Sequence, residues 1–99
     1  MDIYQQFINT IINIMKEIIQ EKLIREFAPS FLEIINNSHL HQNHFVAPNL
    51  ELQNQTHFMI KISAQCFNGM TKINIHRQIN KILSDEFKRG LHALEIKVI

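Results

Sequence analysis

The hydrophobic pattern changes its period at Gly90, and this change constrains the fold more than any other feature. Before Gly90, apolar residues recur at helical spacing, namely Ile73, Ile79, Ile82, Leu83 and Phe87. From Leu94 to Val98, apolar and polar side chains alternate, which is typical of a half-buried strand. A glycine at the end of a helix suits a C-terminal cap. The sequence therefore predicts a helix that ends near Gly90 and leads directly into a strand.

Four further segments complete the expected architecture. The stretch Phe7 to Phe27 has the apolar stripe of a long amphipathic helix, which Pro29 ends. Phe31 to Asn36 and Thr56 to Ser63 have the patterns of two strands, and Met70 to Arg89 is helical. This order, α-β-β-α-α-β, predicts an α+β fold in which a three-stranded sheet carries its helices on one face.

Composition narrows the class of protein. Ninety-nine residues, of which 45% are hydrophobic and 19% charged, predict one folded domain. The single cysteine cannot form an internal disulfide, and the chain opens without the cationic stretch of a secretory signal. No apolar run reaches the length of a membrane span. We therefore expect a cytoplasmic protein without a membrane partner.

Catalysis is not expected from this sequence. It contains no nucleophile with a base and an orienting acid at a recognisable spacing, and no phosphate-binding glycine loop. Six histidines and Cys66 are the available ligands for a transition metal apart from methionine. An iron–sulfur cluster requires about four cysteine thiolates or a mixture with histidine. This chain could supply histidines only if a partner supplied thiolates.

An ordered set of motifs resembles the BolA family. The set comprises Pro29-x-Phe31-Leu32, Ser38-x-x-His41, Thr56-His57-Phe58, Phe67-x-Gly69, His76-Arg77 and His92-Ala93-Leu94. The resemblance covers about Ile18 to Ile99 and implies a class II KH-like fold. It divides the chain into an N-terminal extension of the first helix, residues 1–13, and one BolA-like domain, residues 14–99.

The resemblance also implies a partner and a metal site. BolA-like proteins pair with monothiol glutaredoxins, and the complex shares a [2Fe–2S] cluster held by a glutaredoxin thiolate, a glutathione thiolate and two ligands from the BolA-like side. Those two positions correspond here to His41 and His92. The connection from Ser38 to Asn54 looks longer than is usual in the family, so His44 is an alternative loop ligand. Alone, the chain would be a monomer without a cofactor.

The residues themselves leave the role of His92 open. It shares parity with Leu94, so inside the strand it would face the core, whereas at the first strand position it could turn outward. A loop histidine such as His41 is exposed by default. His57, on the outer strand face, is interpreted as structural, and Cys66, at the end of the second strand, as incidental.

The alternative function is a DNA-binding transcriptional regulator that uses a helix-turn-helix region. The residues that would carry it are Lys72, His76, Arg77 and Lys81. The resemblance implies a short helix, a corner near His76-Arg77 and then a longer helix. The family usually has arginine where this chain has Ile75, and the net charge of +1 provides no broad basic field.

Overall fold

The computed structural model describes residues 3–37 and 56–99. Its elements are α1 (Ile3–Phe27), β1 (Phe31–Asn36), β2 (His57–Ser63), the 3-10 turn η2 (Gln65–Phe67), α3 (Lys72–Ile82), α4 (Ser84–Lys88) and β3 (Ala93–Val98). The predicted α+β class and the order α-β-β-α-α-β are therefore confirmed. None of the described helices is long and apolar enough to cross a membrane.

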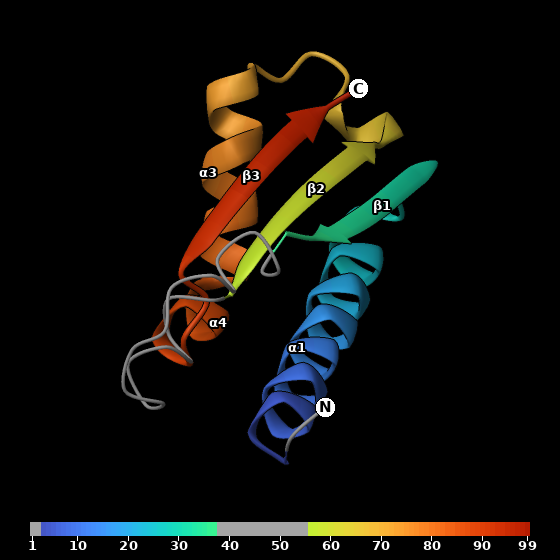
Figure 1. Cartoon of the computed structure of the whole chain (residues 1–99). Helices are drawn as coiled ribbons and strands as arrows, with labels where there is room; N and C mark the ends of the chain where they lie inside the picture. The colour runs from blue at the N-terminus through green and yellow to red at the C-terminus, as the bar shows by residue number, and fades with distance from the viewer. Residues whose placement is uncertain (1–2, 38–55) are drawn as a thin grey trace.

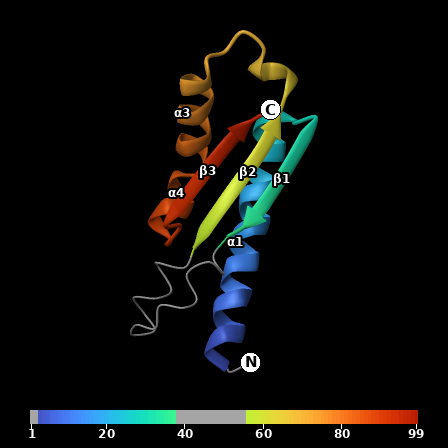
Figure 2. The same cartoon turned by 45° about the horizontal axis from the view of Figure 1, so that its top comes forward.

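The sheet has β2 at its centre (Figure 1). β1 pairs with β2 in the antiparallel direction, with Ile34 opposite Ile60. β3 pairs with the other side of β2 in the parallel direction, with Ile96 opposite Ile60. Figure 2 shows α1 behind β1 and β2, and Figure 1 shows β3 crossing in front of α3. The sheet therefore presents one face to the helices and leaves the other uncovered by them.

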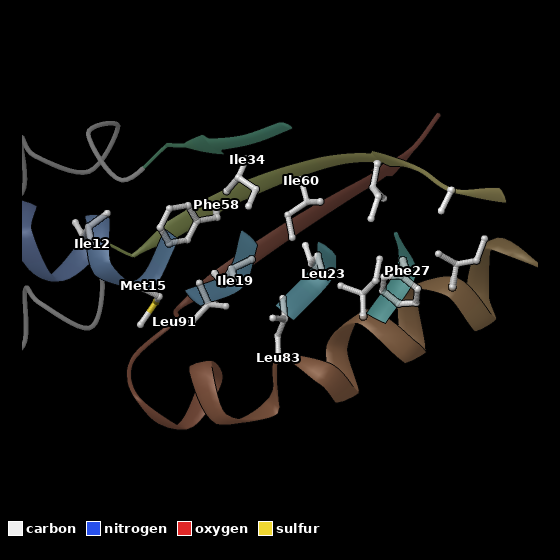
Figure 3. Packing of buried hydrophobic residues seen from close by; sticks show 14 of the residues in the cluster. Ile12, Met15, Ile19, Leu23, Phe27, Ile34, Phe58, Ile60, Leu83 and Leu91 are labelled. Carbon is white, nitrogen blue, oxygen red and sulfur yellow. The ribbon is translucent and has the colours of Figure 1, made fainter. Parts of the chain in front are cut away.

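The hydrophobic core fills the space between the sheet and the helices (Figure 3). Alternate residues of β2 point into it, and Phe58, Ile60 and Ile62 are at most 2% exposed. The helices contribute fully buried residues from one face each, which are Ile19 and Leu23 of α1 and Ile79 of α3, with Leu83 directly after α3. Every second residue of β2 is buried on one face of the sheet, and each helix buries the residues of one side against that face. This burial pattern explains why the sequence forms a two-layer fold.

The first helix begins at Ile3, earlier than the predicted Phe7. Ile8 and Ile12 are buried in the core cluster, so these residues of the expected extension pack within the same domain. Ile3 and Phe7 are exposed. The division of the chain at residue 13 stays a prediction, although α1 runs through that position without a break.

The expected corner near His76-Arg77 is wrong, because α3 passes through these residues as a continuous helix. Thr71 caps its start by accepting a hydrogen bond from the Asn74 amide at 3.2 Å. Ile75 and Ile79 are both buried one turn apart, so packing favours an uninterrupted helix. The break comes at Leu83, and the longer helix precedes the shorter one.

A buried ion pair ties α1 to α4. The carboxylate of Glu86 is 1% exposed and accepts hydrogen bonds from Lys22 Nζ at 2.8 and 3.1 Å. Arg89 Nη1 donates to the same carboxylate at 3.2 Å. The Glu86 carbonyl accepts a hydrogen bond from the Leu91 amide at 2.9 Å. This contact therefore anchors the segment that leads from α4 into β3.

Candidate functional site

His92 lies immediately before β3 and is exposed. The amides of His92 and Ala93 both donate to the carbonyl of Thr56, at 3.0 and 3.1 Å. A carbonyl oxygen has two lone pairs and can accept both bonds, so these contacts hold the backbone of His92 against the start of β2. Of the two alternatives that the sequence left open, the outward position is the one observed, and the packing role in the core is excluded.

Gly90 makes the turn that brings the chain from α4 to His92. Its φ of +121° lies in a region that residues with a side chain rarely adopt. Together with Phe87, Lys88, Leu91 and His92 it lines an open hollow of about 220 Å³. The predicted glycine cap therefore also places His92 at an accessible rim of the domain.

A second imidazole, that of His57, lies beside His92. The two ring centroids are 5.1 Å apart and the ring planes are inclined by 39°. His57 is the first residue of β2, is half-buried, and has Ala93 as its partner in β3. We call His57 and His92 the histidine pair. Because β2 and β3 are parallel, their first residues meet at the same edge of the sheet.

From the sequence, His57 was interpreted as structural, and its position next to His92 was not predicted. A signal was available, because both histidines stand at or just before the start of a predicted strand. Two strands that run parallel as neighbours would place these histidines together. What was missing was the knowledge that β3 pairs with β2 in the parallel direction.

The predicted loop ligands His41 and His44 lie outside the described residues, as does His39. The residues that flank this segment are both next to the histidine pair. The Asn37 amide donates to the His57 carbonyl at 2.8 Å, and the Thr56 carbonyl accepts from the His92 amide. Residues 38–55 are therefore joined to the domain at this edge, and the role of His41 or His44 stays a prediction.

The donor set at this edge fits part of an iron–sulfur site. In Rieske centres two histidines replace two cysteines on one iron, and the histidine pair offers two imidazoles within 5.1 Å between centroids. Among residues 3–37 and 56–99, no group of three or more His, Cys, Asp or Glu side chains could hold a metal ion.

Cys66 cannot join the histidine pair. It follows β2 in η2, at the opposite end of the strand from His57. At about 3.3 Å per residue, the length of β2 alone separates them by roughly 20 Å. The Cys66 thiol instead contacts the Phe27 carbonyl at 3.6 Å.

The four residues of the DNA-binding alternative all lie on α3. Lys72, Arg77 and Lys81 are exposed, and His76 is half-buried. The helix contains no Asp or Glu. A single residue, Leu83, separates α3 from α4, whereas a helix-turn-helix has a turn of three or four residues.

Comparison with known families identifies the chain. The model of the BolA-like protein family matches residues 23–99. The chain belongs to the BolA-like protein family. Members of this family are generally non-catalytic.

Individual relatives and solved structures agree with this BolA-like assignment. The chain is 39% identical over 83 residues to the "Uncharacterized protein in cobS 5'region" of a Sinorhizobium species, covering 84% of this chain and 87% of that one. It is 33% identical to the DNA-binding transcriptional regulator BolA of Vibrio cholerae, covering 83% and 71%. Its fold matches that of BolA1 from Arabidopsis thaliana with a TM-score of 0.69 at 32% identity, over 85% of this chain and 88% of that one.

Proposed function

We propose that this chain is a non-catalytic, cytoplasmic adaptor that binds a monothiol glutaredoxin with glutathione and shares a [2Fe–2S] cluster with it, in iron–sulfur cluster trafficking or iron regulation. The observation that carries the proposal is the exposed position of His92 at the open edge of β2 and β3. In the proposal, His92 is one ligand and a loop histidine, His41 or His44, is the other. Alone, the chain is a monomer without a cluster.

The residues at this edge of the sheet support a site in which this chain supplies imidazoles and the partner supplies thiolates. An iron of a [2Fe–2S] centre accepts two imidazoles when thiolates hold the other iron. His92 can offer a ring nitrogen because its side chain is exposed, and the one cysteine lies at the far end of β2. The partner would therefore supply the thiolates, one from its own cysteine and one from glutathione.

His92→Ala should abolish formation of the mixed cluster. The purified chain is mixed with a monothiol glutaredoxin, glutathione, iron and sulfide. Visible absorption and circular dichroism are then compared with those of the glutaredoxin homodimer. The unmodified chain should shift both spectra, and His92→Ala should leave them at the homodimer values because an iron ligand is missing. His76→Ala, which changes a histidine on α3, is the matched control and should retain the shift.

The proposal fails if the unmodified chain leaves both spectra unchanged and gel filtration shows no complex with the glutaredoxin. It also fails if His92→Ala, verified as folded by far-ultraviolet circular dichroism, produces the full spectral shift. In that second case another residue would provide the ligand.

DNA binding is the second candidate function. It is favoured by the three exposed cations of α3 in a helix without carboxylates, and by the Vibrio cholerae relative, which is named a DNA-binding transcriptional regulator. Lys72, Arg77 and Lys81 could contact phosphates, and such contacts make affinity fall with salt. The single-residue break at Leu83 argues against a standard helix-turn-helix.

If this candidate holds, the double change Arg77→Ala with Lys81→Ala should weaken DNA binding across all sequences and reduce the salt slope by about 2. Fluorescence anisotropy with a labelled duplex at several salt concentrations measures both quantities. Lys97→Ala, on the exposed side of β3, is the control and should change neither. Equal affinity and slope for the double variant and the unmodified chain would exclude α3 as the contact surface.

A further inference from the structure

We propose that one side of α1, toward its N-terminus, is a docking surface for an amphipathic helix of a partner protein that carries a carboxylate at one end. The surface consists of five side chains, which we call the α1 stripe: Ile3, Phe7, Ile11, Ile14 and Ile18. The inference goes beyond the proposed function and does not depend on it, because the histidine pair takes no part. The stripe lies N-terminal to residues 23–99, the part of the chain that the BolA-like family model matches.

α1 has two apolar sides, whereas a helix on the surface of a domain usually has one. The buried side packs in the core through residues such as Ile12 and Ile19. The residues of the α1 stripe recur every three or four positions, so they too share one side of the helix. Within the stripe, Ile3 is 83%, Phe7 59% and Ile14 51% exposed. The stripe is therefore an apolar surface that the described part of the domain leaves largely open.

The length of the α1 stripe matches a short helix of a partner. From Ile3 to Ile18 the helix rises roughly 22 Å, or about four turns. Figure 2 shows the N-terminal part of α1 extending past the ends of the strands, so the sheet does not cover it. A helix that binds in a groove presents apolar residues at three- and four-residue spacing. The stripe has the same spacing and a matching length.

A hollow between α1 and α4 gives the partner's helix an anchoring point. Its volume is about 140 Å³, and it is lined by Ile11, Ile14, Met15, Ile18, Glu86 and Arg89. Sites for free small ligands are usually larger, at about 300–1,000 Å³. A hollow of this size instead accepts one apolar side chain of a protein partner. Such pockets hold the residues that contribute most to binding between proteins.

Arg89 gives this hollow a positive charge that faces solvent. Its Nη1 donates to Glu86, but the Arg89 side chain is 60% exposed. The remaining N–H groups of the guanidinium can therefore reach a carboxylate of the partner. The exposed carboxylates of Glu17 and Glu21 belong to α1 but do not line the hollow. A carboxylate at one end of the partner's helix would thus meet Arg89.

The charges of α1 disfavour two other occupants of the stripe. Helices that lie on membranes are rich in Lys and Arg on their polar side, and residues 3–15 contain neither. The same stripe of a second copy carries no carboxylate, so it would not match Arg89. An uncharged stripe beside an exposed guanidinium fits a helix that is apolar along one side and has Asp or Glu at one end.

The first experiment measures binding of a fluorescein-labelled synthetic helix of about five turns by fluorescence anisotropy. The peptide has leucines at the spacing of the stripe and one Glu at an end. The unmodified chain should bind it, and Ile14→Ser should weaken binding ~10-fold or more because the hollow loses an apolar wall. Ile24→Ser is the matched control and should change nothing, since Ile24 is 48% exposed on the same helix but outside the stripe.

Both substitutions replace exposed residues, and far-ultraviolet circular dichroism verifies that each variant is folded. No binding to the unmodified chain, or equal affinities for Ile14→Ser and Ile24→Ser, would overturn the inference.

A second peptide, with Lys in place of the Glu, tests the charge of the partner. The unmodified chain should bind it about threefold or more weakly than the first peptide, because Arg89 then meets a like charge. Arg89→Gln should remove this preference. Lys88→Gln, which changes the neighbouring exposed cation, should keep most of it. Equal affinity of the unmodified chain for both peptides would overturn the choice of a carboxylate-bearing partner.

Two further measurements exclude the other occupants. Sedimentation velocity should show a monomer, and a dimer that Phe7→Ser dissociates would overturn the inference in favour of a second copy. The chain should not co-sediment with vesicles of phosphatidylcholine and phosphatidylglycerol. Co-sedimentation that is lost in Phe7→Ser would overturn the inference in favour of a membrane surface.

The glutaredoxin mixture separates this inference from the proposed function. Ile14→Ser should keep the spectral shift of the mixed cluster. Loss of the shift in Ile14→Ser but not in Ile24→Ser would overturn the inference, because the stripe would then belong to the glutaredoxin surface. If the unmodified chain forms no mixed cluster but binds the first peptide through the stripe, the adaptor function fails and the docking surface stands.

Discussion

Lys22→Met should lower the free energy of unfolding by about 3–5 kcal/mol. The substitution removes the ammonium that lies 2.8 Å from Glu86 Oε1 and leaves a carboxylate that is 1% exposed. Arg89 still donates to that carboxylate, but its own side chain is 60% exposed. A buried charge that loses its main partner is costly because water cannot replace the lost contact. Urea denaturation followed by circular dichroism measures the change.

Two controls distinguish this cost from a packing effect. In the double variant Lys22→Met with Glu86→Leu, both charges are gone, so most of the lost stability should return. Lys61→Met breaks the partly exposed contact to Glu33 at 3.9 Å and should cost about 1 kcal/mol or less. If the double variant is as unstable as Lys22→Met, the loss comes from the lysine stem and not from the unpaired carboxylate.

Phe58→Ala should cost about 3–5 kcal/mol, because it leaves a cavity in the core at the start of β2. Phe58 is 2% exposed and faces Asn36 of β1 and Leu94 of β3 across the sheet. A domain of this size has a total stability of about 5–15 kcal/mol, so the variant should be close to unfolding at 37 °C. Thermal and urea denaturation give the size of the loss.

Met59→Ala, on the other face of β2, is the matched control and should cost far less because that side chain is only half-buried. Equal losses of stability for Phe58→Ala and Met59→Ala would contradict the assignment of the core to one face of the sheet.

Much of the fold could be predicted because the two hydrophobic periods are clear. Alternation in residues 56–63 and 94–98 predicted β2 and β3 to within one residue, and Pro29 and Gly90 marked the ends of helices. Gly69, between η2 and α3, adopts a φ of +84°, a backbone conformation that glycine tolerates. These features depend on local backbone preferences and on burial of one face, and short stretches of sequence are enough to predict both.

The position of the helical break was not predictable from the family resemblance. Ile75 and Ile79 bury one face of α3 straight through His76 and Arg77, so there was no local reason for a corner at that point. The break follows instead from Leu83, which adopts φ −95° and ψ +16° while its side chain is fully buried. Whether a buried leucine ends a helix depends on tertiary packing, which sequence spacing does not report.

Of the histidine pair, only His92 was singled out from the sequence as a candidate ligand. His92 was identified, and its outward position was one of two alternatives. His57 was overlooked because long-range pairing, not local pattern, brings it next to His92. Parallel pairing between β2 and β3 is a property of the whole sheet, and no short motif of this chain encodes it.

The amides of His92 and Ala93 both donate to the Thr56 carbonyl. The direction of the His92 side chain therefore depends on the number of residues from Gly90 to Ala93 as well as on their types. An inserted residue there would keep every side chain of the chain intact yet reverse the side to which the imidazole projects. Such an insertion should therefore be as damaging to the proposed sharing of a cluster as loss of the histidine itself.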